Sequence, residues 1–144
     1  MEFIKFILLG LLAALGPIIG FVVSFYVKDE LKKGRFLVEM ALKLVLLAIV
    51  VIVLVSKLDS YTEIVIILAL VIFQVLKSPF LYLTYGVLLF TSSFNPEVAG
   101  SIYMLTFIYF LFDGALKKQL KQVVINSLLF LITSLVAYGA WSIS

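Results

Sequence analysis

Long apolar stretches alternate along this chain with short segments that hold most of its charges. The stretches 6–27 and 122–143 contain no charged residue, and the stretch 36–56 contains only Glu39 and Lys43. A helix needs about 20 apolar residues to cross the hydrocarbon core of a bilayer. Each of these three stretches therefore predicts a transmembrane helix.

The middle of the chain holds three shorter apolar segments, at 61–76, 79–94 and 97–112. Ser-Pro at 78–79 and Asn-Pro at 95–96 each place a capping residue before a proline, which is typical of a helix start. The residue before a proline also resists the helical conformation, so both positions predict breaks.

A capping-box pattern supports the start of the first of these helices. Ser60 and Glu63 stand three residues apart just before an apolar segment, and such a pair satisfies backbone N–H groups in the first helical turn. The fold class expected is all-α: a polytopic transmembrane helix bundle forming one domain over 1–144. It has either six spans or four spans plus a re-entrant helical hairpin at 61–94.

Composition supports a membrane location and removes much chemistry. The chain is 65% hydrophobic and 13% charged, whereas soluble domains are about half apolar and about a quarter charged. It has no cysteine and no histidine, which removes disulfides, thiolate nucleophiles and most zinc sites. We expect no metal and no cofactor.

Basic residues divide unequally between the two sides of a six-span bundle. One side carries Lys28, Lys32, Lys33, Arg35, Lys77, Lys117, Lys118 and Lys121, and the other carries Lys5 and Lys57. Cytoplasmic loops are enriched in lysine and arginine. The pattern predicts a cell (cytoplasmic) membrane protein, prokaryotic by its Lys, Ile, Leu and Val content, with basic loops 28–35 and 113–121 cytoplasmic and both termini outside.

The tripeptide Leu-Lys-Lys occurs in both of these basic segments, at 31–33 and at 116–118, each time shortly after an aspartate. One interpretation is that the first and last helical hairpins are repeats in the same orientation, a layout found in some transporters. The other is that two basic loops were selected independently for topology.

Glu39 and Lys43 are the most unusual residues because they lie inside an apolar span. They are four residues apart and so share one helix face, with the glutamate first, the order that favours pairing. A lone charge near the middle of a span costs at least about 2.5–3.5 kcal/mol, so these side chains should face the bundle interior or a hydrated cavity. They are expected either to form part of a transport pathway or to make a structural ion pair, possibly with a partner helix.

Glycine and proline interrupt the first span at its midpoint. Pro17 removes a helical hydrogen bond there, which predicts either a kink or a short unwound stretch of the kind that lines transporter sites. Gly16 and Gly20 also form a Gly-x-x-x-Gly pattern, which predicts close packing of a second helix. Gln74 and Asn126 are secondary polar candidates near the cytoplasmic ends of their spans.

The remaining sequence gives no sign of catalysis. It contains no nucleotide-binding glycine loop, zinc-protease motif or nucleophile elbow, so an enzyme is not expected, with a lipid-active membrane enzyme as the exception. We expect a transporter or channel for an ion or small solute. The alternative is a non-catalytic subunit of a larger membrane complex. The expected partners are the lipid bilayer and either a homo-oligomer or other membrane subunits, without nucleic acid.

Overall fold

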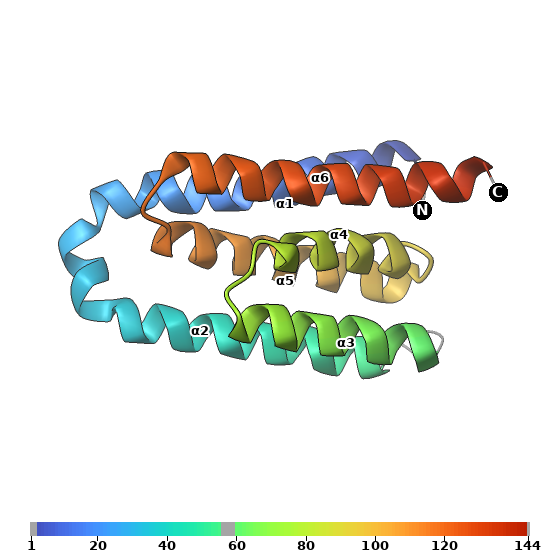
Figure 1. Ribbon diagram of the computed structural model, residues 1–144, viewed down its shortest axis with the longest axis horizontal. Coiled ribbons are helices and arrows are strands. Elements are labelled where there is room, and N and C mark those ends of the chain that lie inside the picture. Colours follow the sequence, from blue (N-terminus) through green and yellow to red (C-terminus); the bar gives the residue numbers. More distant parts are fainter. Residues whose placement is uncertain (1–2, 56–59, 144) are drawn as a thin grey trace.

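The computed structural model describes residues 3–55 and 60–143, apart from the side chain of Ser60, and these ranges form six helices and no strand. The helices are α1 (Phe3–Tyr26), α2 (Lys28–Val55), α3 (Ser60–Val75), α4 (Phe80–Ser92), α5 (Pro96–Leu116) and α6 (Leu120–Ile143). Successive helices run in opposite directions, so both ends of the described chain lie at one end of an elongated bundle (Figure 1). The connections α1–α2 and α5–α6 lie at the opposite end, which we call the basic end.

Each helix lies on a predicted span, and the largest difference is at the start of α2. The expected cytoplasmic loop 28–35 is helical, because α2 begins at Lys28 directly after a one-residue turn at Val27. Its lysines, glutamate, leucine and arginine are good helix formers, and Asp29 and Glu30 favour the positive end of the helix dipole. The predicted end of this span at Ser56 lies outside the described residues.

The proline breaks are confirmed, and one of the two expected capping bonds forms. α5 begins at Pro96 after Asn95 in an extended conformation, without a hydrogen bond from the Asn95 side chain to the helix end. α4 begins at Phe80, whose backbone N–H donates to Oγ of Ser78 at 3.3 Å. The side chain of Ser78 therefore caps α4 as expected, whereas the start of α5 depends on the backbone restrictions of proline.

Two of the six helices are markedly shorter than the others. α1, α2, α5 and α6 are long and apolar enough to cross a membrane, whereas α3 and α4 are not. α3 and α4 form a hairpin whose connection lies part-way along the bundle rather than at the basic end (Figure 1). The four long helices therefore extend past this hairpin on the basic side.

Helix packing is organised around the contact between α1 and α5. α6 packs on α1, α2 packs on α5, and the hairpin packs through α4 on α6 and α5. The first and last helical pairs are thus interleaved, since the second helix of each pair rests on the first helix of the other.

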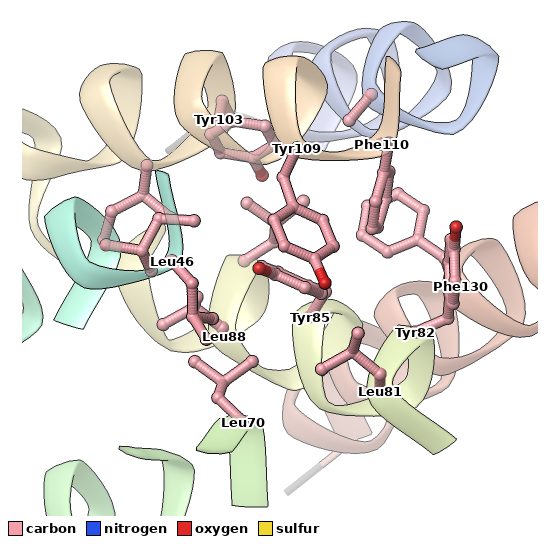
Figure 2. Packing of buried hydrophobic residues seen from close by; sticks show 14 of the residues in the cluster. Leu46, Leu70, Leu81, Tyr82, Tyr85, Leu88, Tyr103, Tyr109, Phe110 and Phe130 are labelled. Atoms are coloured by element: carbon pink, nitrogen blue, oxygen red, sulfur yellow. The ribbon is translucent and has the colours of Figure 1, made fainter. Parts of the chain in front are cut away.

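Aromatic rings fill the centre between α4, α5 and α6 (Figure 2). Tyr82 of α4 stacks on Phe110 of α5 with ring centroids 4.6 Å apart, and Tyr85 lies 5.2 Å from the same ring. Phe130 of α6 meets Phe110 edge-on at 5.0 Å. Such pairs add about 0.5–1.5 kcal/mol each beyond their buried area, so this layer holds α4, α5 and α6 in a fixed relation.

Candidate functional site: a polar cavity at the basic end

A cavity of about 710 Å³ opens between α2, α5, α6 and the tip of the α3–α4 hairpin. It exists because the hairpin stops part-way along the bundle while the three surrounding helices continue (Figure 1). Its charged and polar lining consists of Arg35, Glu39, Lys43, Gln74, Lys77, Ser78, Tyr82, Asp113, Lys117, Gln122 and Asn126. Much of the outer surface of the bundle is apolar, so the six charged side chains gathered in this lining, of both signs, mark the cavity as the candidate site.

Four candidate residues predicted from the sequence lie on the wall of this cavity. Glu39 and Lys43 come from α2, Gln74 comes from the end of α3, and Asn126 comes from α6. Asn126 is only 6% exposed. The fold therefore brings together four polar side chains that are far apart along the chain.

Glu39 does not make the ion pair expected from its spacing to Lys43. Its Oε1 lies 3.2 Å from Nε of Arg35, one turn earlier on α2, with the two side chains 42% and 53% exposed. Lys43 is exposed and forms no ion pair with any described residue. A carboxylate in a mostly apolar helix is better solvated when it reaches toward the polar end, which is the direction of Arg35.

Asp113 is the most enclosed charge in the cavity. The hydroxyl of Tyr82 donates a hydrogen bond to Oδ2 of Asp113, and Nζ of Lys117 lies 3.5 Å from the same oxygen. The side chain of Asp113 is 14% exposed, and Tyr82 is 2% exposed. Hydrogen bonds to a charged group are worth about 1.5–3 kcal/mol, so Tyr82 and Lys117 together fix this carboxylate in the cavity wall.

A stripe of polar side chains runs from Asp113 into the bundle along one face of α5. Tyr109, Thr106 and Tyr103 follow at helical spacing and are all nearly or completely buried. The stripe from Asp113 to Tyr103 covers about 15 Å of helix, at about 1.5 Å per residue. The hydroxyl of Tyr109 donates to Oε1 of Gln74, which joins the stripe to the cavity wall.

Three buried hydroxyl groups, two in this stripe and one beside it, lack a partner among the described residues. They belong to Tyr103, Thr106 and Tyr85, whose ring lies 5.0 Å from that of Tyr109. Figure 2 places Tyr85 of α4 against Tyr109 of α5, with Tyr103 further along α5. A buried hydroxyl without a hydrogen bond costs about 1–3 kcal/mol, and buried water commonly satisfies such groups.

Sequence reasoning missed these tyrosines and Asp113 as parts of a site. Tyrosines in apolar helices are typical of the membrane interface as well as of the interior, so the sequence positions of Tyr82, Tyr85 and Tyr109 do not point to a site. In the structure, all three rings are completely or almost completely buried. The spacing of Tyr103, Thr106, Tyr109 and Asp113 by three, three and four residues is the signal that could have revealed one polar helix face.

The glycine-proline segment of α1 lies away from the cavity and packs against α5. α1 is helical from Phe3 to Tyr26, so Pro17 does not produce the unwound stretch that was one of the two expectations. A methyl group added at Gly16 would lie 2.9 Å from Cβ of Phe110, and one at Gly20 would lie 1.9 Å from the backbone oxygen of Leu111. The Gly-x-x-x-Gly pattern therefore serves close helix contact.

The described residues contain no cluster of acidic, cysteine or histidine side chains that could hold a metal ion. No known protein family, curated protein or solved structure matches the chain. A function can therefore be inferred only from the geometry and charge of the cavity.

Proposed function

We propose that this chain is a small integral membrane protein that transports a small anionic solute through the polar cavity. The observation that carries this proposal is that a cavity of about 710 Å³ lies next to a stripe of buried polar side chains inside an apolar bundle, with Asp113 common to both. Polar and charged groups at membrane depth are costly and typically line ion or substrate paths.

Membrane residence rests on the outer surface of the bundle. Large apolar side chains are exposed on several helices, among them Leu8 at 61%, Leu44 at 57%, Ile64 at 55% and Leu128 at 50%. Soluble monomers rarely expose apolar patches larger than a few hundred Å². Four helices have the length and hydropathy to cross a bilayer, so lipid is the natural solvent for this surface.

The proposed topology has four spans and a re-entrant hairpin formed by α3 and α4. The hairpin helices are shorter than a bilayer crossing requires, and their connection lies part-way along the bundle (Figure 1). Lysine and arginine favour the cytoplasmic side, which puts the basic end in the cytoplasm of the cell and both termini outside. Lys57, expected on the outer side, lies outside the described residues.

The anionic character of the solute follows from the charges in the cavity. Both carboxylates in its lining are paired, Glu39 with Arg35 and Asp113 with Lys117. Lys43 and Lys77 have no ion pair with a described residue and face the cavity from different elements. The cavity therefore offers two uncompensated positive charges to a solute entering from the basic end.

Lys77 is held in place by an unusual backbone conformation. Its φ is 50°, the only positive value among the described non-glycine residues. Left-handed backbone costs an ordinary residue about 1–2 kcal/mol, and here it ends α3, with the N–H of Ser78 donating to the backbone oxygen of Phe73 at 3.0 Å. Lys77 lies in the connection between α3 and α4, and this conformation turns the chain at the point where it lines the cavity.

Tyr82, which lines the cavity, packs with Tyr85 and Phe110 in one aromatic layer (Figure 2), and we propose that this layer separates the cavity from the outer end. The buried hydroxyl groups of Tyr85, Tyr103 and Thr106 do not line the cavity and lie deeper in the bundle. This arrangement fits a transporter open toward the cytoplasm, in which the α3–α4 hairpin moves to expose the hydroxyls during transport.

The proposal is tested by electrical recording from proteoliposomes adsorbed on a solid-supported membrane. Concentration jumps of chloride, phosphate or succinate serve as probes. We expect a transient current for at least one of them, and we expect Lys43→Met to reduce it at least tenfold. Lys33→Met is the matched control, since it removes a lysine from the same helix outside the cavity lining. Absence of current with every probe, or equal currents in the two variants, contradicts the proposal.

One observation favours a second candidate function, that of a non-catalytic subunit in a larger membrane complex. Lys43 is exposed as well as unpaired among the described residues, so an acidic side chain of another membrane protein or of a second copy of this chain has access to it. Under this alternative, Lys43→Met releases a co-purifying partner, whereas transport by the protein alone predicts no change in composition.

A further inference from the structure

A second pocket lies at the basic end, where the α1–α2 junction meets the end of α5. Its volume is about 500 Å³, and its lining includes five cationic residues and no carboxylate. The cations are Lys28, Lys32, Arg35, Lys117 and Lys118. This pocket differs in chemistry from the neighbouring cavity, which contains Glu39 and Asp113.

Three of the five cations carry uncompensated charge. Arg35 and Lys117 pair with carboxylates that line the larger cavity. Lys28, Lys32 and Lys118 form no ion pair with any described residue. Three like charges around one pocket repel one another, and an anion placed between them relieves that repulsion.

Apolar side chains form the remaining wall of the pocket. Phe21 and Phe25 of α1 meet edge-on with ring centroids 5.0 Å apart, and Leu31 and Leu116 also line the space. Phe25 is 64% exposed, so the pocket is continuous with the apolar outer surface of α1. A free inorganic anion gains nothing from these rings, whereas a lipid can place its headgroup among the lysines and its acyl chain along α1.

The pocket is also where the two Leu-Lys-Lys segments of the sequence converge. Leu31 and Lys32 come from the first segment, and Leu116, Lys117 and Lys118 form the second. The close contact of α1 with α5, at Gly20 and Leu111, holds the two segments side by side. The α1–α5 contact therefore assembles one site from two halves that are far apart in the chain.

We propose that this pocket binds the phosphate headgroup of an anionic phospholipid from the cytoplasmic leaflet. The inference depends on the membrane residence proposed above but not on the transport of any solute. Basic pockets between helices on the cytoplasmic side are typical headgroup sites. Lys28, Lys32 and Lys118 supply the charge, and Phe25 contacts the first part of an acyl chain.

Native mass spectrometry of the purified protein in detergent, titrated with phosphatidylglycerol or phosphatidylcholine, tests the proposal. We expect preferential binding of phosphatidylglycerol. Each lysine near an anionic lipid contributes about fivefold in affinity, so the double variant K32Q/K118Q should bind phosphatidylglycerol about thirtyfold more weakly. The matched double variant K33Q/K121Q removes the same charge from the basic end outside the pocket and should bind within about threefold of the original chain.

Equal weakening in the two double variants overturns the proposal, since it indicates general attraction to positive charge. Equal binding of both lipids overturns it as well. Complete displacement of phosphatidylglycerol by millimolar inorganic phosphate assigns the pocket to a free anion instead. Far-UV circular dichroism verifies that both variants fold. Loss of lipid selectivity with normal solute currents refutes this inference alone, whereas selective binding without currents refutes transport alone.

Discussion

Replacing Gly20 by alanine should destabilise the bundle through the α1–α5 contact. The added methyl group would lie 1.9 Å from the backbone oxygen of Leu111 and 2.8 Å from its carbonyl carbon. These are backbone atoms of a helix, so no side-chain rotation relieves the clash. The two helices must separate locally by about 1.5 Å to restore an ordinary contact, and overpacking of this kind costs about 1–3 kcal/mol.

Gly10→Ala is the matched control because it makes the same chemical change on the same helix. A methyl group at Gly10 meets nothing within 4 Å, and alanine favours the helical state by up to about 1 kcal/mol. We therefore expect the free energy of unfolding of Gly20→Ala to be about 2 kcal/mol below that of Gly10→Ala. Titration of the reconstituted protein with sodium dodecyl sulphate, followed by far-UV circular dichroism, measures this difference. Equal stabilities would refute the close α1–α5 contact.

Substitutions at three further positions, Gly86, Lys77 and Tyr82, test other parts of the fold and the cavity. Gly86→Ala places a methyl group 2.9 Å from Cβ of Thr133 and 3.0 Å from the backbone oxygen of Phe130, so the same unfolding titration should show a loss of about 1 kcal/mol; an unchanged stability contradicts the α4–α6 contact. Lys77→Val should lower stability by about 1–2 kcal/mol because valine resists positive φ, whereas Lys77→Gly should not; equal losses refute the left-handed backbone. Tyr82→Phe removes the hydrogen bond to Asp113, and a double-mutant cycle with Asp113→Asn should give a coupling of about 1.5 kcal/mol or more; additive effects would contradict that bond.

The helices were predictable because their signals are local. Apolar runs and the prolines at positions 79 and 96 are visible along one dimension, and five of the six helices begin within a few residues of their predicted starts. α2 begins at Lys28 rather than at 36 because hydropathy reports the apolar stretch, whereas the lysines, Glu30, Leu31 and Arg35 that precede it are also good helix formers. The length of an apolar run and the length of its helix are separate properties.

The candidate site was only partly predictable because it is assembled by packing. Glu39, Lys43, Gln74 and Asn126 stood out as polar residues in apolar spans, and all four line the cavity. Their convergence depends on the α3–α4 hairpin stopping part-way along the bundle, which no single segment encodes.

Tyr82 could not be predicted as a site residue because a tyrosine near a span boundary has the same sequence pattern whether it is buried or interfacial. Asp113 could not be predicted either, because it lies at the start of the expected basic loop 113–121. The partner of Glu39 was also ambiguous along the chain. Arg35 and Lys43 are both four residues away from it, and the order of charges favours Lys43 on an isolated helix. The structure pairs Glu39 with Arg35, in the direction of the polar end of α2.

The sequence contains no cysteine, so single cysteines can report directly on whether a hydrated cavity lies within membrane-embedded helices. Lys43 and Leu44 are neighbours at the same depth on α2. Lys43 lines the cavity, whereas Leu44 does not line it and is 57% exposed on the outer surface. In inside-out membrane vesicles, we expect a membrane-impermeant charged maleimide to label Lys43→Cys rapidly and Leu44→Cys at least tenfold more slowly, because lipid suppresses the reactive thiolate. Equal labelling of the two cysteines, whether fast or slow, would contradict a hydrated cavity inside a lipid-embedded bundle.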